Sequence, residues 1–338
     1  MNERFKSTLL TLLLCLAPSI AVQAQQTGSA LKSSADSYPT KPLRFVVGLA
    51  PGGATDIVAR LIAQKLTEAL GQSVIVDNRS GAAGSIGAGI VAKAQPDGYT
   101  LLVVSSSFGI NPSLYDLPFD SIKDFAPVIQ IGQAPFLLVV TPSLPVQTVK
   151  DLIALAKAKP GTLNFSSGGH GGSGHMAGEL FKRMADIQVD HVPYRGGSPA
   201  VTGVISGQVQ FTFSAIVAGL QHWRAGRLRA LGVTSAKRSN AAPDVPTIAE
   251  GGVPGYHVLT WYGVLAPAGT ANAAVTKLNQ EMNKIVRMPE IVQRFVADGA
   301  EPVGGAPADF GRHLADEINR FRKLAKDVGV RSEKGSLR

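Results

Sequence analysis

Apolar residues in the first third of the chain change from a continuous run to a helical spacing. The run at residues 43–47 predicts a buried strand, and the loop after it ends in Gly52 and Gly53. Apolar residues then recur every three or four positions as far as Leu70, which is typical of an amphipathic helix. This stretch therefore predicts a strand, a glycine loop and a helix in direct succession.

An anion can bind where such a loop meets its helix. The first N–H groups of a helix have no acceptor within it, and glycines let a ligand approach the backbone closely. Thr55 or Asp56 is the expected cap of this helix. The loop is neither a Walker A motif nor G-x-G-x-x-G. Our hypothesis is that a carboxylate binds the amides of Gly52, Gly53, Ala54 and Thr55; a connection without ligand remains the alternative.

The same alternation continues through the next sixty residues. Strands are predicted at residues 74–77 and 100–104, with a glycine loop and a helix between them. This βαβαβ order predicts a parallel sheet whose strand ends share one edge. The third strand is followed by Ser105, Ser106 and Ser107, which we therefore expect at that edge.

The middle of the chain predicts a second lobe of the same architecture. Two extended runs, at residues 128–131 and 136–140, lead into it, and another at 258–265 leads back. Between them, strands alternate with helices and with a glycine-rich loop at residues 167–174. The fold expected is therefore α/β with two lobes and two crossovers. Its predicted lobes are residues 38–138 plus 262–338, and residues 139–261.

The first 24 residues predict a secretory signal peptide. Arg4 and Lys6 precede the apolar run at residues 9–16, and the segment ending at Ala24 has the small-x-Ala form of a cleavage site. The run is too short to span a membrane. We therefore expect cleavage after Ala24, export, and a disordered lead-in over residues 25–37.

The charge of the chain limits the classes of partner. A formal net charge of +9 over 338 residues favours anionic partners in general. The basic residues are scattered, without a long basic run or interleaved aromatic residues, which argues against nucleic acid. His170 and His175 share the glycine-rich loop, but no third or fourth ligand of suitable spacing accompanies them. We therefore expect no metal and no cofactor.

An enzyme of the exported serine hydrolase class is the alternative that the sequence leaves open. Ser173 lies in the segment Gly-Gly-Ser-Gly-His, which is close to the G-x-S-x-G nucleophile motif. The segment precedes a predicted helix but does not directly follow a strand.

Several short motifs together resemble one protein family. In chain order they are Gly-Gly-Ala-Thr-Asp at 52–56, Asp-Asn-Arg at 77–79, Pro-Asp-Gly-Tyr at 96–99, Lys-Asp-Phe at 123–125, Gly-Glu-Leu-Phe at 178–181, His-Val-Pro-Tyr-Arg-Gly at 191–196, Gly-Gln-Val at 207–209, Pro-Asp-Val-Pro-Thr at 243–247 and Leu-Ala-Pro at 265–267. The chain from about residue 38 to its last helix resembles the periplasmic solute-binding subunits of tripartite tricarboxylate transporters, the TctC or Bug proteins.

This resemblance implies a periplasmic binding protein of the two-lobed, type II Venus flytrap class. Such a protein is not an enzyme, acts as a monomer, and captures a small carboxylate, either a di- or tricarboxylate or an aromatic or aliphatic monocarboxylate. It delivers the carboxylate to membrane permease subunits of the TctA and TctB type. By position, the expected ligand-binding residues are Gly52, Gly53, Ala54, Thr55, Asp56, Ser105, Ser106, Ser107, Ser166, Ser167, His175, Tyr194 and Ser214.

Two departures from the family pattern bear on the ligand. Many relatives have proline and an aromatic residue where this chain has Gly48 and Leu49. Many also have Asp-Asn where this chain has Ser214 and Ala215. The second departure removes an acidic group that could face an amino group or a second polar end of the ligand. It therefore favours a plain carboxylate over an amino acid.

Overall fold

The computed structural model describes residues 38–327, so the predicted signal peptide and lead-in lie outside the described residues. The strands are β1 (Leu43–Val47), β2 (Val74–Asn78), β3 (Thr100–Ser105), β4 (Phe125–Val140), β5 (Asn164–Ser167), β6 (Asp190–Pro193), β7 (Phe211–Ala215), β8 (Arg229–Val233), β9 (Leu259–Pro267) and β10 (Glu301–Pro302). The helices are α1 (Ala54–Leu70), α2 (Ser85–Ala92), α3 (Ser107–Ile110), α4 (Val149–Ala158), α5 (Ser173–Ala185), α6 (Gly197–Ile205), α7 (Ile216–Arg224), α8 (Asn272–Val286), α9 (Pro289–Ala297) and α10 (Pro307–Asp327), with short 3-10 turns at Ala82–Gly84 and Asn111–Ser113. Within residues 38–327, no helix has both the length and the apolar character that crossing a membrane requires.

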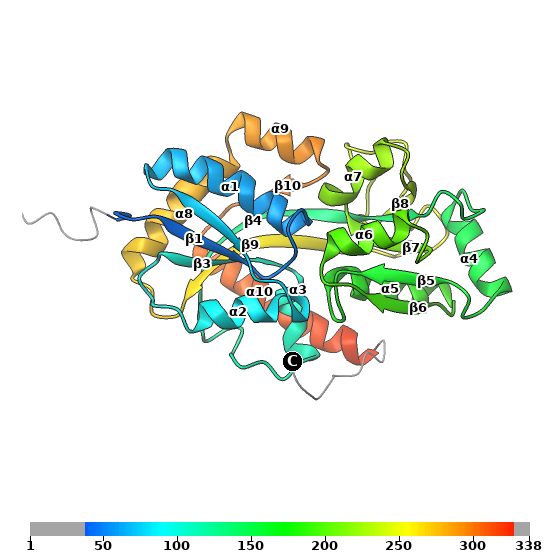
Figure 1. Ribbon diagram of the computed structural model, residues 1–338, viewed down its shortest axis with the longest axis horizontal. Helices are drawn as coiled ribbons and strands as arrows, with labels where there is room; N and C mark the ends of the chain where they lie inside the picture. Colours follow the sequence, from blue (N-terminus) through cyan, green and yellow to red (C-terminus); the bar gives the residue numbers. More distant parts are fainter. Residues whose placement is uncertain (1–37, 328–338) are drawn as a thin grey trace, which may run out of the picture.

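Two sheets form the two halves of the molecule seen in Figure 1. In the first half, β2, β1 and β3 are parallel, as predicted, and β9 and then β4 join them in antiparallel orientation. In the second half, β7, β5 and β6 are parallel, and β4 lies antiparallel to both β7 and β8. The parallel strands of both halves end toward the gap between the halves.

Strand β4 belongs to both sheets and is the first connection between the halves. Its residues up to Pro135 pair with β9, and its residues from Phe136 pair with β7. The returning connection enters β9 at Leu259. The buried hydroxyl of Thr234 accepts a hydrogen bond from the Phe136 amide at 2.7 Å and donates one to the Val258 carbonyl at 2.6 Å. One side chain therefore joins the two connecting segments at the point where they pass between the halves.

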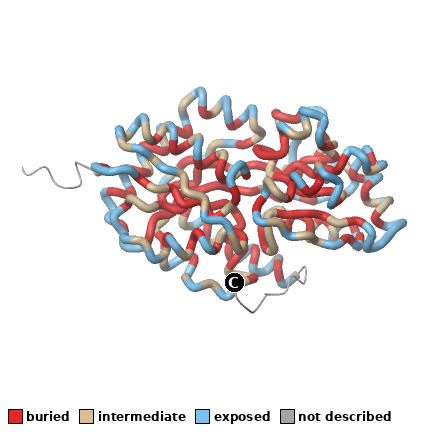
Figure 2. The backbone as a smooth tube through the Cα atoms, viewed as in Figure 1, coloured by how far each residue is buried: buried red, intermediate tan, exposed pale blue. Residues whose placement is uncertain are grey.

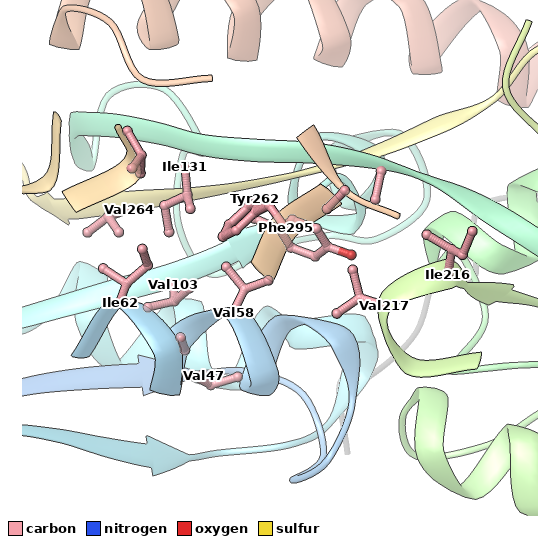
Figure 3. Packing of buried hydrophobic residues seen from close by; sticks show 14 of the residues in the cluster. Val47, Val58, Ile62, Val103, Ile131, Ile216, Val217, Tyr262, Val264 and Phe295 are labelled. Atoms are coloured by element: carbon pink, nitrogen blue, oxygen red, sulfur yellow. The ribbon is translucent and has the colours of Figure 1, made fainter. Parts of the chain in front are cut away.

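Helices cover both faces of the sheets, so that the strands are buried and the outer helix faces are exposed (Figure 2). A cluster that includes Val58, Val103 and Phe295 fills the space between the first sheet and α1, α8 and α9 (Figure 3). On the opposite face, Phe310 of α10 packs edge-on against Trp261 of β9. The indole of Trp261 donates to Glu317 at 3.1 Å. Trp261 is thus a core residue of the first half.

Three sequence predictions about the elements are wrong in detail. The two extended runs at residues 128–131 and 136–140 are one sixteen-residue strand, β4, because strand pairing continues across Gly132 and Pro135. Helix α7 lies between β7 and β8, although the residue pattern predicts strands at 209–213 and 228–233 in direct succession. The spacing of Met176, Leu180, Phe181 and Met184 predicts one apolar face of α5, but Met184 is 39% exposed.

The close packing of α10 on β9 leads to a stability prediction. A Cβ atom on Gly263 would lie 2.2 Å from the Phe310 ring, which is far inside van der Waals contact. We expect Gly263→Ala to lower the free energy of unfolding by roughly 1–3 kcal/mol, measured by urea unfolding. The loss should be smaller in a Phe310→Leu background, because the shorter side chain leaves room for the methyl group. An equal loss in both backgrounds would contradict this account.

Candidate functional site

A partly enclosed cavity of about 90 Å³ lies in the gap between the two sheets. The first half contributes Leu49, Gly53, Ala54, Thr55, Ala83, Ser105, Ser107, Thr260 and Tyr262 to its lining. The second half contributes Phe136, Gly168, Gly172, Ser173, Gly174, Gly197, Ala200, Val201, Thr212, Phe213, Ser214, Ala215 and Ala218. The lining contains no charged side chain. Recognition of an ion in this cavity must therefore depend on the backbone and on hydroxyl groups.

Helix starts supply that backbone polarity from both sides of the cavity. In α1 the first helical hydrogen bond runs from Ile57 to the Gly53 carbonyl, so the amides of Ala54 and Thr55 precede it. In α5 the first bond runs from Met176 to the Gly172 carbonyl. The start of α6, at Gly197, also lines the cavity. Unpaired amides at the positive ends of helix dipoles favour an anion here.

Asp56 holds the loop before α1 but does not line the cavity. Its carboxylate accepts hydrogen bonds from the Gly52 amide at 2.8 Å, the Arg60 guanidinium at 2.9 Å and the Asn78 amide group at 3.0 Å. Burial acts to raise the pKa of Asp56, but the hydrogen bonds from Arg60, Gly52 and Asn78 lower it overall. The carboxylate is thus ionised and fully engaged within the protein.

These contacts correct two predictions about the helix start. The cap residue is Gly53, with extended backbone angles, and neither Thr55 nor Asp56 caps the helix. The Gly52 amide donates to Asp56 and is therefore not available to a ligand. The Gly53 amide donates weakly to the Ala50 carbonyl at 3.3 Å. The donors that remain for a ligand on α1 are the amides of Ala54 and Thr55.

The predicted serines divide between the cavity and the protein interior. Ser105, Ser107 and Ser214 line the cavity, and the first two bond to each other at 3.0 Å. Ser106 instead bonds to Thr260 at 2.9 Å. In β5 the Ser166 hydroxyl donates to the Ala200 carbonyl at 2.9 Å, and the Ser167 hydroxyl bonds to His191 at 2.7 Å. Ser106, Ser166 and Ser167 therefore hold the walls of the cavity from behind.

His175 and Tyr194 are predicted to bind the ligand, but neither lines the cavity. His175 is 2% exposed, and its Nδ1 accepts the Gly171 amide at 3.0 Å, which ties the glycine-rich loop to α5. Its Nε2 lies 3.6 Å from Glu179. The Tyr194 hydroxyl donates to Gln208 at 3.3 Å beside α6. The alternation of apolar and polar residues along short strands does not show whether a ring in the following loop faces the cavity or the protein interior.

Three histidines come together where the sequence spacing predicted no third ligand. Ring nitrogens of His170, His175 and His191 lie within 4.8 Å of one another. The rings of His175 and His191 stack with centroids 3.9 Å apart, however, so their planes do not converge on one ion. His175 and His191 also use ring nitrogens to bond Gly171 and Ser167. As packed, the cluster is a partly buried group of rings at the glycine-rich loop, in which His175 is the buried member.

Four polar residues line the cavity that the sequence does not predict as ligand-binding residues, namely Ser173, Thr212, Thr260 and Tyr262. Ser173 was considered only as a nucleophile, although its position at the start of α5 matches that of Ala54 at the start of α1. No hydrogen bond joins Ser173 to a histidine in residues 38–327. Tyr262 lies on the returning strand β9, where the apolar run gave no indication of which residue faces the gap.

The two halves touch on both rims of the cavity. On one rim the Ser198 hydroxyl donates to the Pro51 carbonyl at 3.4 Å. On the other the Tyr115 hydroxyl donates to the His170 carbonyl, and Met176 packs in one cluster with Leu114. The cavity is therefore closed over on opposite sides, and the arrangement corresponds to a binding cleft with its halves together.

Comparison with known proteins gives a consistent result. The family model of the tripartite tricarboxylate transporter family receptor, TctC, matches residues 58–330. Protein BugT of Bordetella pertussis is 38% identical over 315 residues, which cover 92% of this chain and 97% of that protein.

Two solved structures extend the similarity to the fold. R. palustris Rpa4515 with adipate is 41% identical with a TM-score of 0.85, over 86% of this chain and 98% of that one. MatC from Rhodopseudomonas palustris with bound malate is 30% identical with a TM-score of 0.79, over 85% of this chain and 99% of that one. The predicted α/β, two-lobed binding-protein fold is confirmed.

The partly buried histidine cluster leads to a prediction about pH. Burial, with the nearby charges of His175, His170 and Lys182, lowers the pKa of His191 to about 2. The unfolded chain therefore takes up a proton near pH 6.5 that the folded chain does not, and stability falls as the pH drops below that value. Between pH 7 and pH 5, we expect this group to cost roughly 2 kcal/mol of unfolding free energy.

Urea unfolding at both pH values tests the prediction. The loss of stability on acidification should be smaller in His191→Gln than in the wild type, because the variant lacks the proton-binding ring. An identical loss in the two proteins would show that the ring is protonated equally in the folded and unfolded states.

Proposed function

The chain belongs to the TctC family of tripartite tricarboxylate transporter receptors, and from this premise we propose that it binds a small carboxylate in the cavity between its lobes. The main observation in support is a cavity lined by helix starts and hydroxyl groups without a charged side chain. A carboxylate can accept hydrogen bonds from the unpaired amides of Ala54 and Thr55 without displacing an internal partner. The resemblance predicted from the sequence motifs is confirmed.

The facing helix start suggests a dicarboxylate. Ser173 and Gly174 at the start of α5 lie across the cavity from Ala54 at the start of α1. A ligand with an anionic group at each end can contact both lobes at once and stabilise the closed arrangement. The relatives solved with adipate and with malate contain such ligands. No acidic side chain lines the cavity to pair with an ammonium group, which supports a plain acid over an amino acid.

The remaining roles in the proposal follow the family. The protein acts in the periplasm, as a monomer, and delivers its ligand to permease subunits of the TctA and TctB type. We propose the lobe division of residues 38–138 plus 262–338, and residues 139–261. The change of strand partners at Pro135 and the return of the chain at Leu259 support boundaries close to these. The cavity lining contains no histidine or carboxylate to activate Ser173, which supports binding without catalysis.

A thermal-shift panel tests the proposed function. The purified protein is heated with succinate, malate, adipate, citrate, glutamate and a neutral diamide, each at a saturating concentration. We expect the melting temperature to rise with at least one plain carboxylate, by an amount set by RT ln(1 + [L]/Kd), and not with the diamide. No rise with any acid, or hydrolysis of ester substrates that Ser173→Ala abolishes, would contradict the proposal.

The position of the anion is tested by Gly53→Val. Gly53 has a φ of −76° and a ψ of 165°, which valine adopts readily, so the backbone of the loop should be retained. A Cβ atom on Gly53 would lie 3.2 Å from the Ala50 carbonyl oxygen and 4.0 Å from the Ser198 hydroxyl. Because Gly53 lines the cavity directly before Ala54, the added side chain should weaken binding of the best acid at least tenfold by calorimetry. Thr148→Val, at the start of α4 away from the cavity, is the control and should lower stability but not affinity. Unchanged affinity in Gly53→Val would refute this location.

A further inference from the structure

We propose that the hydroxyl of Tyr262 determines which acid the cavity accepts, by donating a hydrogen bond to an oxygen of the ligand that the α1 amides do not hold. This inference rests on the proposed function and adds a specificity-determining residue to it. Tyr262 was not among the residues predicted from the sequence, and it lies on β9, which connects the lobes.

The burial of this hydroxyl without a partner is the first observation. Tyr262 is 1% exposed, and within the described part of the chain its hydroxyl oxygen has no hydrogen-bond partner. Tyr256 is buried to the same extent, but its hydroxyl donates to the Ala177 carbonyl at 2.7 Å. Buried tyrosine hydroxyl groups nearly always find a partner, because desolvation without one is costly. The unpaired group on Tyr262 therefore indicates a position kept for a molecule from outside.

The position of the ring is the second observation. Tyr262 lines the cavity together with Thr55 of α1 and Ala218 of α7. In Figure 3 its ring lies beside Phe295, and its oxygen points toward the side of α7 on which Val217 is labelled. The ring thus reaches the cavity from β9, between lining residues that belong to α1 and to α7.

Four other hydroxyl groups in the lining already have partners within the protein, whereas within residues 38–327 those of Thr55 and Ser173, at the starts of α1 and α5, have none. Ser105 and Ser107 bond to each other, Thr260 bonds to Ser106, and Thr212 donates to the Ser166 carbonyl at 2.7 Å. Thr212 can donate to a ligand only by giving up its internal bond, and in each hydroxyl pair the hydrogen of one member is already used. Tyr262 has no such bond to lose, so a new hydrogen bond there contributes fully to affinity.

The chemistry of the phenol sets which ligands it selects. Burial raises the pKa of Tyr262, so the group stays protonated and can donate. A carboxylate or hydroxyl oxygen of the ligand next to the phenol would satisfy it. A hydrocarbon chain in the same place would leave the phenol hydroxyl without a hydrogen-bond partner. The cost of that unpaired group discriminates strongly against such ligands. The cavity should therefore prefer an acid with a second oxygen-bearing group over a monocarboxylate of equal length.

Matched pairs of acids and the variant Tyr262→Phe test this inference. Calorimetry compares succinate with butyrate, and adipate with hexanoate, for the wild type and the variant. We expect the wild type to prefer the diacid of a pair. Tyr262→Phe should lower the affinity for that diacid roughly ten- to a hundredfold and leave the affinity for the monoacid unchanged or higher.

The melting temperature without ligand separates a binding role from a structural one. Removing an unpaired buried hydroxyl should leave the melting temperature unchanged or raise it. The control Tyr256→Phe loses a hydroxyl that has a partner, so it should melt at a lower temperature and bind all acids as the wild type does.

The outcomes are distinct. Equal diacid affinity in the wild type and Tyr262→Phe would overturn the inference and leave the proposed function standing. Equal losses for diacid and monoacid with a lowered melting temperature would also overturn it, in favour of a structural role. A wild type that binds none of the four acids would overturn the proposed function together with the inference.

Discussion

Unpaired backbone amides at the starts of α1, α5 and α6 are the physical feature on which the cavity depends. Parallel strands in both sheets end at the same gap, so the helices that follow them begin there. Each helix start contributes partial positive charge and free donors to a lining without charged side chains. Electrostatic preference for an anion therefore arises from chain topology, and both lobes contribute to it.

This arrangement requires that acidic side chains near the helix starts be paired within the protein, because they would otherwise compete with a ligand anion for the amides. Asp56 is the only acidic residue in the first turn of α1, and its carboxylate is paired with Arg60, Asn78 and the Gly52 amide. An unpaired carboxylate there would repel the proposed ligand and would be costly to bury. The same three bonds fix the loop, so the amides of α1 hold their direction before a ligand arrives.

The sequence predicted the parallel strands, the first helix and the resemblance, because apolar periodicity and glycine loops are local signals. It could not predict which side of a loop each polar side chain would occupy. His175 and Ser167 follow the same glycine pattern as Ser173, yet they pack with His191 behind the wall. Tyr262 comes from a strand far along the chain, and only the pairing of β9 with β3 and β4 brings it to the cavity.

An anchor made of main-chain amides is insensitive to most amino-acid replacements, because every residue except proline supplies the same N–H group. Substitutions of side chains that line the cavity can therefore change which acid fits, while the backbone hydrogen bonds to its carboxylate are retained. Duplicated genes for such a receptor can diverge toward new nutrients one wall residue at a time, without passing through a form that has lost all affinity for anions. Leu49 and Ser214, whose side chains belong to the walls of the cavity, are positions where this divergence has room to occur.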